Sequence, residues 1–200
     1  MVLSNKEIRE LVKTGKLIDG FKEDRLQAAS YDVSAGFKVQ RFKKHTKRIS
    51  LISKESVDAV CEEVGIQFGY DLAPGEYILL KLNERLNMPN NLVAHIRPRT
   101  TLTKLGLVIS HQHLNPRFTG YIYLGLLNAS PYTIEIRPNL IVGQIVFEQI
   151  ASIPTEEKWY DKKTNAKYKD EDEFIGSKVY DEIEAKVEEK YKKLIQELNK

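Results

Sequence analysis

Hydrophobic and polar residues alternate in short runs from about residue 28 to residue 150. The runs cover 30–42, 72–82, 87–98, 119–128 and 131–150, and Pro, Gly or Asn residues mark the turns between them. No helical pattern of about 10–15 residues separates one run from the next, as it would in βαβ units. The pattern therefore predicts a mainly β fold, a barrel or a sandwich, and no glycine motif of a Rossmann or P-loop protein is present.

Helical periodicity appears only at the two ends of the chain. At residues 4–14, Ser4 is a good N-cap, the carboxylate of Glu7 can reach back to the cap amide, and Gly15 is placed to end the helix. A second helix is predicted at 179–199. Its apolar stripe consists of Ile183, Val187, Tyr191, Leu194 and Leu198. We expect this stripe to pack on its own domain or on a neighbouring subunit.

Charge divides the chain near Pro154. Residues 155–200 contain 13 acidic and 11 basic side chains, a net charge of −2. The whole chain has 28 acidic and 31 basic side chains, so residues 1–154 contain 15 acidic and 20 basic ones, a net charge of +5. We expect a β domain over 1–154 and a charged tail over 155–200, in which 156–176 is peripheral or mobile. The near balance of charge argues against a protein held to nucleic acid by bulk charge.

The single cysteine, Cys61, excludes an intrachain disulfide and a cysteine-rich zinc site. The first residues lack the apolar segment of a signal peptide, and no apolar run approaches the ~18 residues of a membrane span. These features predict a cytoplasmic protein with no membrane partner.

The segment 97–107, RPRTTLTKLGL, is the most informative for chemistry. It combines three cations with two hydroxyls: Arg97, Arg99, Lys104, Thr100 and Thr101. LTKLG is typical of a short helical turn closed by Gly106, and amides at a helix start flanked by hydroxyl and guanidinium groups suit a phosphate. The alternative interpretation is a basic loop that only faces water.

Three further polar residues interrupt the apolar pattern. His111 and His113 share a face if the backbone is extended, but two histidines without a nearby acid are weak evidence for a metal site, so we favour surface or hydrogen-bonded histidines. Gln144 lies inside an apolar strand, where its amide must bond to the backbone or to a ligand.

Four segments, taken together, resemble the superfamily of dCTP deaminases and dUTPases. SYDVSAG (30–36) is similar to its S-x-D-x-R-x-G segment, and residues 74–107 are similar to its P-G-E strand followed by the Arg-Ser-Ser-Leu phosphate loop. Residues 114–128 resemble its Ile-Asp-x-x-Phe-x-Gly hairpin, and 136–150 the segment that ends in Gly-Gln-Leu-x-Phe. The four occur in the family's order, and the similarity runs from the N-terminal helix to about residue 150, roughly three quarters of the chain.

The resemblance implies a distorted β-barrel or jelly-roll-like dUTPase fold and a homotrimer with active sites between subunits. It implies dCTP or dUTP as substrate, Mg²⁺ carried by the triphosphate, and no zinc, since the residues of zinc deaminases are missing. Within the charged tail, residues 168–177 lie where members of the family have a segment that folds over the site.

Carried over by position, the resemblance implies phosphate-binding roles for the loop cations and hydroxyls and for Gln144. Arg99 matches the first arginine of the phosphate loop, the two threonines match its serines, and Lys104 matches a second arginine. The complete expected set is Arg97, Arg99, Thr100, Thr101, Lys104 and Gln144. Asp32 matches an aspartate for which we expect a structural role.

Two departures concern the chemistry itself. Asn115 stands where the family has the hairpin aspartate, and Gly125 stands where deaminases have a catalytic glutamate. Neither replacement can take a proton from water at neutral pH, and His111 and His113 are the nearest groups that can. The candidate catalytic residues are Thr100, Lys104, Asn115 and His113.

The sequence leaves three functions open. The first is a deoxypyrimidine nucleoside triphosphate hydrolase that resembles dCTP deaminase, with dUTP diphosphatase as its alternative. The second is a nucleotide-binding or regulatory protein without catalysis, and the third is a scaffold whose charged tail binds a partner.

Overall fold

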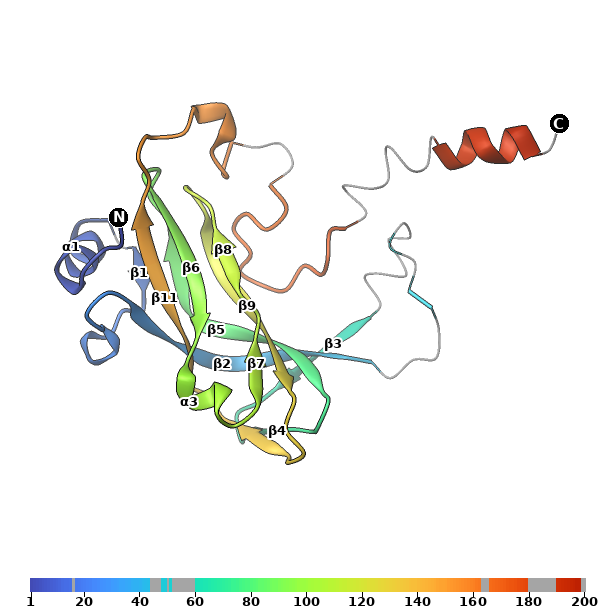
Figure 1. Cartoon of the computed structure of the whole chain (residues 1–200), viewed down its shortest axis with the longest axis horizontal. Helices are drawn as coiled ribbons and strands as arrows, with labels where there is room; N and C mark the ends of the chain where they lie inside the picture. The colour runs from blue at the N-terminus through green and yellow to red at the C-terminus, as the bar shows by residue number, and fades with distance from the viewer. Residues whose placement is uncertain are drawn as a thin grey trace. The chain divides into compact units, whose positions relative to one another are not determined.

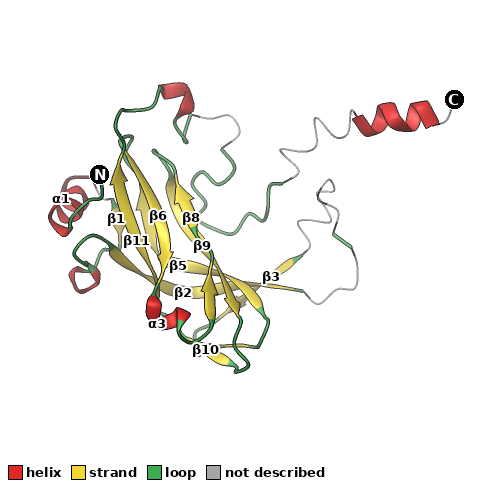
Figure 2. Ribbon diagram, viewed as in Figure 1, coloured by secondary structure: helices red, strands yellow, loops and turns green. Residues whose placement is uncertain are grey.

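A computed structural model describes residues 1–15, 17–43, 48–49, 51, 60–162, 166–179 and 190–198 (Figure 2). The helical elements are α1 (Asn5–Gly15), η1 (Glu23–Arg25), α3 (Thr100–Thr103) and η2 (Glu156–Lys158). The strands are β1 (Ile18–Asp19), β2 (Tyr31–Phe42), β3 (Cys61–Gly65), β4 (Tyr70–Leu72), β5 (Tyr77–Asn87), β6 (Leu92–Pro98), β7 (Leu107–Ile109), β8 (Gln112–Leu114), β9 (Thr119–Asn128), β10 (Ile134–Ile136) and β11 (Ile141–Gln149). The prediction of a mainly β chain is confirmed.

The main sheet has the strand order β7-β9-β5-β2-β11-β6-β8 (Figure 1). Strands β7 and β8 lie at opposite ends of this order, yet only Ser110 and His111 separate them along the chain. Since two residues span only a few Cα–Cα steps of about 3.8 Å, the sheet must curl until its two edges meet. The expectation of a barrel-like fold is therefore confirmed, and the closure point lies at Ser110–His111.

The inner face of the curled sheet carries the hydrophobic core. Alternate residues of β5 are buried, among them Ile78, Leu80 and Leu82, as the two-residue side-chain period of a strand requires. Phe37 departs from the alternation of its strand and is 53% exposed. The pairing of β2 with β5 shifts register between Ala35 and Val39, so Phe37 lies in an irregular stretch that turns its ring away from the core.

Helix α1 forms as its sequence predicts. The Glu7 carboxylate accepts a hydrogen bond of 2.7 Å from the Ser4 amide, the contact expected for Glu7 at the start of this helix. Ile8 is fully buried, and Leu11 and Val12 pack against the core from the same stripe. The helix ends at Gly15.

A buried ion pair lies between strands β2 and β5. Arg25 and Glu84 are 7% and 2% exposed, and the Arg25 guanidinium contacts the Glu84 carboxylate at 2.5 Å. Glu84 also accepts hydrogen bonds from the Ser34 amide and hydroxyl, each at 2.9 Å. The two charges therefore compensate each other inside the barrel, and neither is left without a partner.

Residues 170–174 form an acidic strap on the outer face of β5 and β9. The strap extends the sheet, because the Asp170 amide donates to the Thr119 carbonyl and the Tyr121 amide donates to the Glu171 carbonyl, both at 3.0 Å. Its acidic side chains meet basic ones of the barrel: Asp172 pairs with Arg85, and Glu173 pairs with Lys38 and Lys81.

The strap covers Tyr123, which points outward from β9 and is nevertheless only 7% exposed. Phe174 packs on its ring with a centroid distance of 5.1 Å. Burial raises the pKa of the Tyr123 phenol, and the carboxylates of Glu173 and Glu171 raise it further. Tyr123 is therefore a packing residue beneath the strap.

Contacts divide the chain into two units, Met1–Arg41 with Glu63–Phe174, and Phe42–Glu62 with Ile175–Lys200. The strap thus belongs to the barrel unit. In the second unit, residues 190–198 are helical. Of the helix expected at 179–199, residues 180–189 and 199 lie outside the described residues. Tyr191 and Leu194 of its apolar stripe are more than half exposed. No helix in the described part of the chain has the length and apolar character needed to cross a bilayer.

Candidate functional site

Asp32, Gln144 and Arg97 lie side by side on the outer face of three adjacent strands. Gln144 of β11 is paired with Asp32 of β2 on one side and with Arg97 of β6 on the other. Directly paired residues project from the same face of a sheet, so the three side chains form one row. The Gln144 amide oxygen accepts a hydrogen bond of 3.3 Å from Ser30, and no described residue accepts one from its nitrogen. Gln144 thus has a donor to offer to a ligand.

Arg99 extends this row to the start of α3. Its guanidinium lies 3.7 Å from the carboxylate of Asp32, which is 4% exposed and also accepts a hydrogen bond from Gln27 at 3.1 Å. Asp32 therefore orients Arg99, in agreement with the structural role that the sequence predicts for it. An anion would meet the outer side of the guanidinium, since a carboxylate itself repels phosphate.

The expected turn of the phosphate loop is present, but it is short. Helix α3 has four residues, and Gly106 ends the turn with a positive φ of 82°. One turn adds little dipole, so anion binding here depends on side chains. Thr100, Thr101 and Lys104 are exposed, and none of the three has an ion pair or a side-chain hydrogen bond within the described residues.

The hairpin between β8 and β9 lies away from this loop. Leu114 pairs with Ala94, so Asn115 lies one residue beyond that pair, whereas Arg97 lies at the other end of β6. Four residues of strand separate the two positions, roughly 13 Å, and the α3 residues lie farther along. A single chain therefore does not bring Asn115 together with Arg97, Arg99, Thr100 and Lys104.

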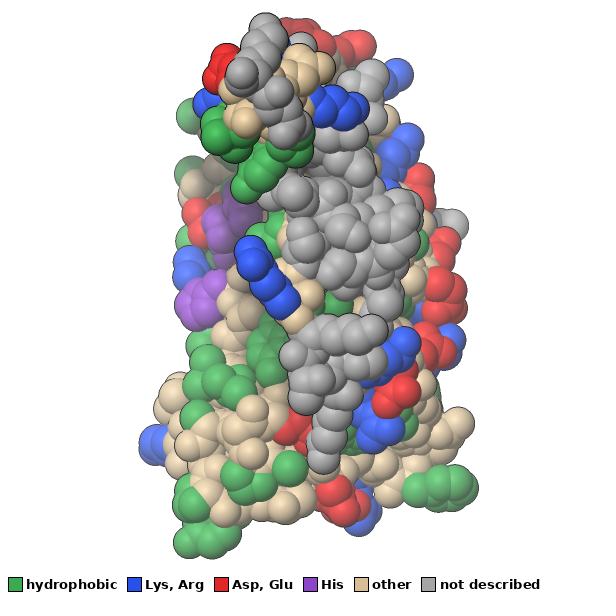
Figure 3. Space-filling view, turned by 90° about the vertical axis from the view of Figure 1, so that its right-hand side faces the viewer, with side chains coloured by type: hydrophobic (Ala, Val, Ile, Leu, Met, Phe, Trp, Pro, Cys, Tyr) green, Lys and Arg blue, Asp and Glu red, His purple; other side chains and the backbone are tan. Residues whose placement is uncertain are grey.

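The histidines lie nearer to the row. His113 pairs with His95 across β8 and β6, and its Nδ1 is 2.9 Å from His95 Nε2. His111 Nδ1 is 3.4 Å from a guanidinium nitrogen of Arg97. Histidine side chains gather along one side of the surface in Figure 3. Among the residues that the structure describes, no group of three or more His, Cys, Asp or Glu side chains is placed to hold a metal ion.

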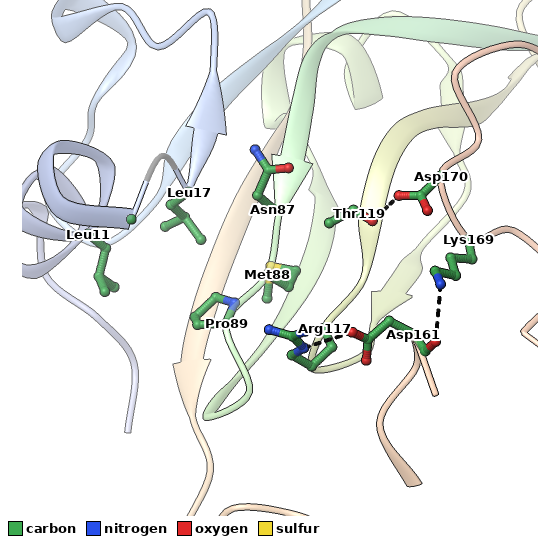
Figure 4. Close-up of a pocket in the computed structure, with 11 residues that line it drawn as sticks. Leu11, Leu17, Asn87, Met88, Pro89, Arg117, Thr119, Asp161, Lys169 and Asp170 are labelled. Carbon is green, nitrogen blue, oxygen red and sulfur yellow. Dashed lines mark hydrogen bonds and ion pairs between the residues drawn. The ribbon is translucent and has the colours of Figure 1, made fainter. Parts of the chain in front are cut away.

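A separate pocket of about 510 Å³ lies beside the hairpin (Figure 4). Its floor is apolar, and its rim carries charged and polar residues that pair with one another. Arg117 pairs with Asp161 at 2.6 Å, Lys169 donates to the Asp161 carbonyl, and Thr119 bonds to Asp170. None of the phosphate-binding candidates lines this pocket, so it is distinct from the site predicted from the sequence.

The Arg117–Asp161 pair gives a pH prediction. Its hydrogen bonds lower the pKa of Asp161 below the ordinary 3.8, although desolvation opposes this shift. A lowered folded-state pKa adds stability that is present above 3.8 and is lost as the pH falls through the lower value. Asp161→Asn should therefore lower stability by about 1 kcal/mol or less between pH 5 and 8. The difference should shrink below pH 3.8.

Thermal unfolding of both proteins across pH checks this, followed by the fluorescence of Trp159, the only tryptophan of the chain. Its ring lies 5.4 Å from the Arg117 guanidinium and reports on the contact. A constant difference down to pH 2 would contradict the prediction.

Comparison with known proteins decides the family. A model described as dCTP deaminase-like matches residues 2–150. The chain belongs to the dCTP deaminase-like family. A dCTP deaminase of Tolumonas auensis is 28% identical over 192 residues, which cover 90% of this chain and 98% of that protein. A dUMP-forming dCTP deaminase of Corynebacterium glutamicum is 30% identical over 186 residues, which cover 90% and 97%.

The fold of this dCTP deaminase-like chain is also found in a solved structure. The 2'-deoxycytidine 5'-triphosphate deaminase of Agrobacterium tumefaciens superposes with a TM-score of 0.62 at 21% identity. The match covers 74% of this chain and 48% of that one. The likeness shows that the two share a fold.

The structure gives a physical reason for the glycine of this family member at position 125. A Cβ built on Gly125 would lie 2.0 Å from the hydroxyl oxygen and 2.7 Å from the Cζ of Tyr77, whose ring therefore covers the glycine. The Gly125 amide also donates to the Ser110 hydroxyl at 2.8 Å. Any side chain at position 125 would need Tyr77 to move. The glycine is thus part of a packed arrangement with Tyr77.

Three residues near the candidate site escaped the sequence prediction: Tyr77, His95 and Glu148. Each occupies an outward position of its strand. Tyr77 directly follows the Pro-Gly-Glu segment but was given no role there, and His95 and Glu148 have no distinctive motif around them. Only the pairing of β6 with β8 and β11, and of β5 with β9, brings them to the other residues. The sequence offered one signal for two of them: His95 and Glu148 are polar residues at outward positions of strands that are otherwise apolar.

Proposed function

We propose that this protein binds a deoxypyrimidine nucleoside triphosphate, dCTP or dUTP, and hydrolyses it. The observation that carries the proposal is the row of Arg97, Gln144 and Arg99 beside the exposed loop of α3. These side chains present cations and hydrogen-bond donors to solvent, with no carboxylate partner on the side that faces solvent. Such groups suit the negative charge and the oxygen atoms of a triphosphate. Membership of the dCTP deaminase-like family supports the same substrate class.

Each residue has a distinct part in this binding. Arg97 and Arg99 offer planar guanidinium groups to phosphate oxygens, and Lys104 offers a more flexible charge. Thr100 and Thr101 offer hydroxyl donors. Mg²⁺ would arrive on the triphosphate as part of the substrate, and we propose that the protein does this in the cytoplasm.

We further propose that the complete site forms between copies of the chain in a homotrimer. The roughly 13 Å of strand between the positions of Arg97 and Asn115 supports this, since one chain leaves hairpin and phosphate loop apart. A second copy could bring its hairpin to the loop. A monomer in sedimentation experiments with saturating dCTP would contradict the arrangement.

A second candidate function is nucleotide binding without turnover. The packing of Tyr77 over Gly125 favours it, because a hydroxyl group takes the space that a carboxylate side chain would need. A phenol hydroxyl group offers a proton and does not replace the proton-accepting carboxylate. In that case the protein would act as a sensor or regulator of the nucleotide.

A thermal-shift measurement paired with NMR detection of products distinguishes hydrolysis from binding without turnover. Both predict that dCTP or dUTP with Mg²⁺ raises the melting temperature, and hydrolysis also predicts dUTP, dUMP or diphosphate in NMR spectra. Arg97→Met should weaken nucleotide binding about tenfold or more, because a hydrogen bond to a charged group contributes about 1.5–3 kcal/mol.

Arg137→Met is the matched control, since Arg137 is exposed and pairs with Glu135 next to β10. Its affinity should equal that of the wild type. Stabilisation without products would favour the binding function, and a melting temperature unchanged by millimolar nucleotide would reject both functions.

A further inference from the structure

Glu148, His95 and His113 form a line across three neighbouring strands, β11, β6 and β8. His113 Nδ1 lies 2.9 Å from His95 Nε2, with the two rings 4.9 Å apart. The Glu148 carboxylate lies 3.3 Å from the other nitrogen of His95, Nδ1. Each imidazole nitrogen of His95 therefore faces one partner. His113 is the exposed end of this line, and Glu148 at the other end is partly exposed.

The surroundings of His95 determine which nitrogen carries the proton. His95 Nδ1 is buried and has no hydrogen-bond partner among the described residues. The Glu148 carboxylate lies 3.3 Å away, outside hydrogen-bond geometry, and is the charged group in contact with this nitrogen. A carboxylate accepts and cannot donate, so we assign the proton of His95 to Nδ1, which leaves Nε2 as an acceptor. His113 then donates from Nδ1 to His95 Nε2. The remaining nitrogen of His113, Nε2, has its lone pair free.

The line lies next to the proposed phosphate-binding row. His95 precedes Arg97 by two residues on β6, so both side chains project from the same face about 6–7 Å apart along the strand. The charged and titratable groups around the pair are Glu148 on β11, Arg97 on β6 and His111 before β8. A phosphate held by Arg97 would therefore lie near the free nitrogen of His113.

We propose that Glu148 and His95 are positioning residues that present His113 Nε2 as the general base for attack on the α-phosphate; this rests on the proposed function. The nitrogen accepts one proton from water while the water oxygen bonds to the α-phosphorus. The bond from that phosphorus to the bridging oxygen breaks, and diphosphate leaves with the electron pair. The proton then passes from His113 to solvent. The line replaces the proton acceptor that Asn115 cannot provide.

The experiment measures kcat, KM and the pH profile of dUTP hydrolysis by the full chain. His113→Gln should lower kcat about 100-fold, the lower end of general-base contributions. Binding of α,β-imido-dUTP, measured by thermal shift, should not change. Glu148→Gln should lower kcat less than His113→Gln does and leave KM unchanged, because a neutral amide orients the imidazole of His95 less firmly than a carboxylate does.

Glu135→Gln removes a carboxylate of similar exposure in β10 and should match the wild type in every measurement. If the wild type turns over dUTP and His113→Gln keeps kcat within twofold of it, His113 is not the general base, but the proposed function still stands. Turnover of dCTP but not of dUTP by the wild type would overturn the role of His113 and leave the proposed function standing, and turnover of neither nucleotide would overturn both. Nitrogen-15 spectra of the histidines add a readout without substrate, and a proton on Nε2 of His113 at neutral pH would also overturn the assignment.

Discussion

Glu84→Ala is expected to lower the free energy of unfolding by about 3–5 kcal/mol, which is the cost of leaving one member of a buried ion pair without its partner. Arg25 is 7% exposed in the intact protein, and Ser34 would be the remaining hydrogen-bond partner of its guanidinium among the described residues. The Ser34 amide would also lose its acceptor. Urea unfolding followed by circular dichroism measures the change.

Two further variants separate charge from packing. Arg25→Met/Glu84→Leu removes both charges, so it should recover part of the loss, with the Ser34 amide still unpaired at a cost of about 1–3 kcal/mol. Glu135→Ala, at an exposed site, should change stability by less than about 0.5 kcal/mol. If Glu84→Ala were no more destabilising than Glu135→Ala, the pair would contribute nothing.

Gly125→Ala is expected to destabilise the protein by about 1–3 kcal/mol or more, the usual cost of extra volume in a packed region. The new Cβ would lie 2.0 Å from the Tyr77 hydroxyl oxygen, and the Tyr77 ring would have to move. Gly15→Ala is the matched control. No atom lies within 4 Å of a Cβ at Gly15, which ends α1, so this change should be neutral or stabilising.

A double-mutant cycle identifies the clash. Tyr77→Phe should not relieve it, since Cζ remains 2.7 Å from the new Cβ, whereas Tyr77→Ala should. The double variant Gly125→Ala/Tyr77→Ala should be more stable than the sum of the single effects by about 1 kcal/mol or more. Strict additivity would mean that Tyr77 does not exclude a side chain from position 125.

The cycle also bears on chemistry. Gly125→Glu alone should unfold more easily and gain no activity, because Tyr77 takes the space of the new side chain. Gly125→Glu/Tyr77→Ala would give the carboxylate room. The change at position 125 is thus one half of a pair, and its partner lies 48 residues earlier in the chain.

The sequence by itself determined the elements. Alternation of apolar residues located the long strands, because a strand with one buried face must repeat every two residues. Local signals located the cap at Ser4 and Glu7 and the turn that ends at Gly106, since both depend on neighbouring residues only. The same local reading selected Arg97 to Lys104 as a cluster of cations and hydroxyls.

Tertiary structure alone decided which distant residues meet. Strand register placed Gln144 between Asp32 and Arg97, and it placed His113 opposite His95. Register depends on the whole curled sheet, so no local pattern encodes these pairs.

The same holds for the space over Gly125. The sequence shows a glycine where a carboxylate was expected, and only the packing of Tyr77 explains it. Local sequence patterns thus identified the candidate residues, and the closure of the barrel determined which residues lie next to them.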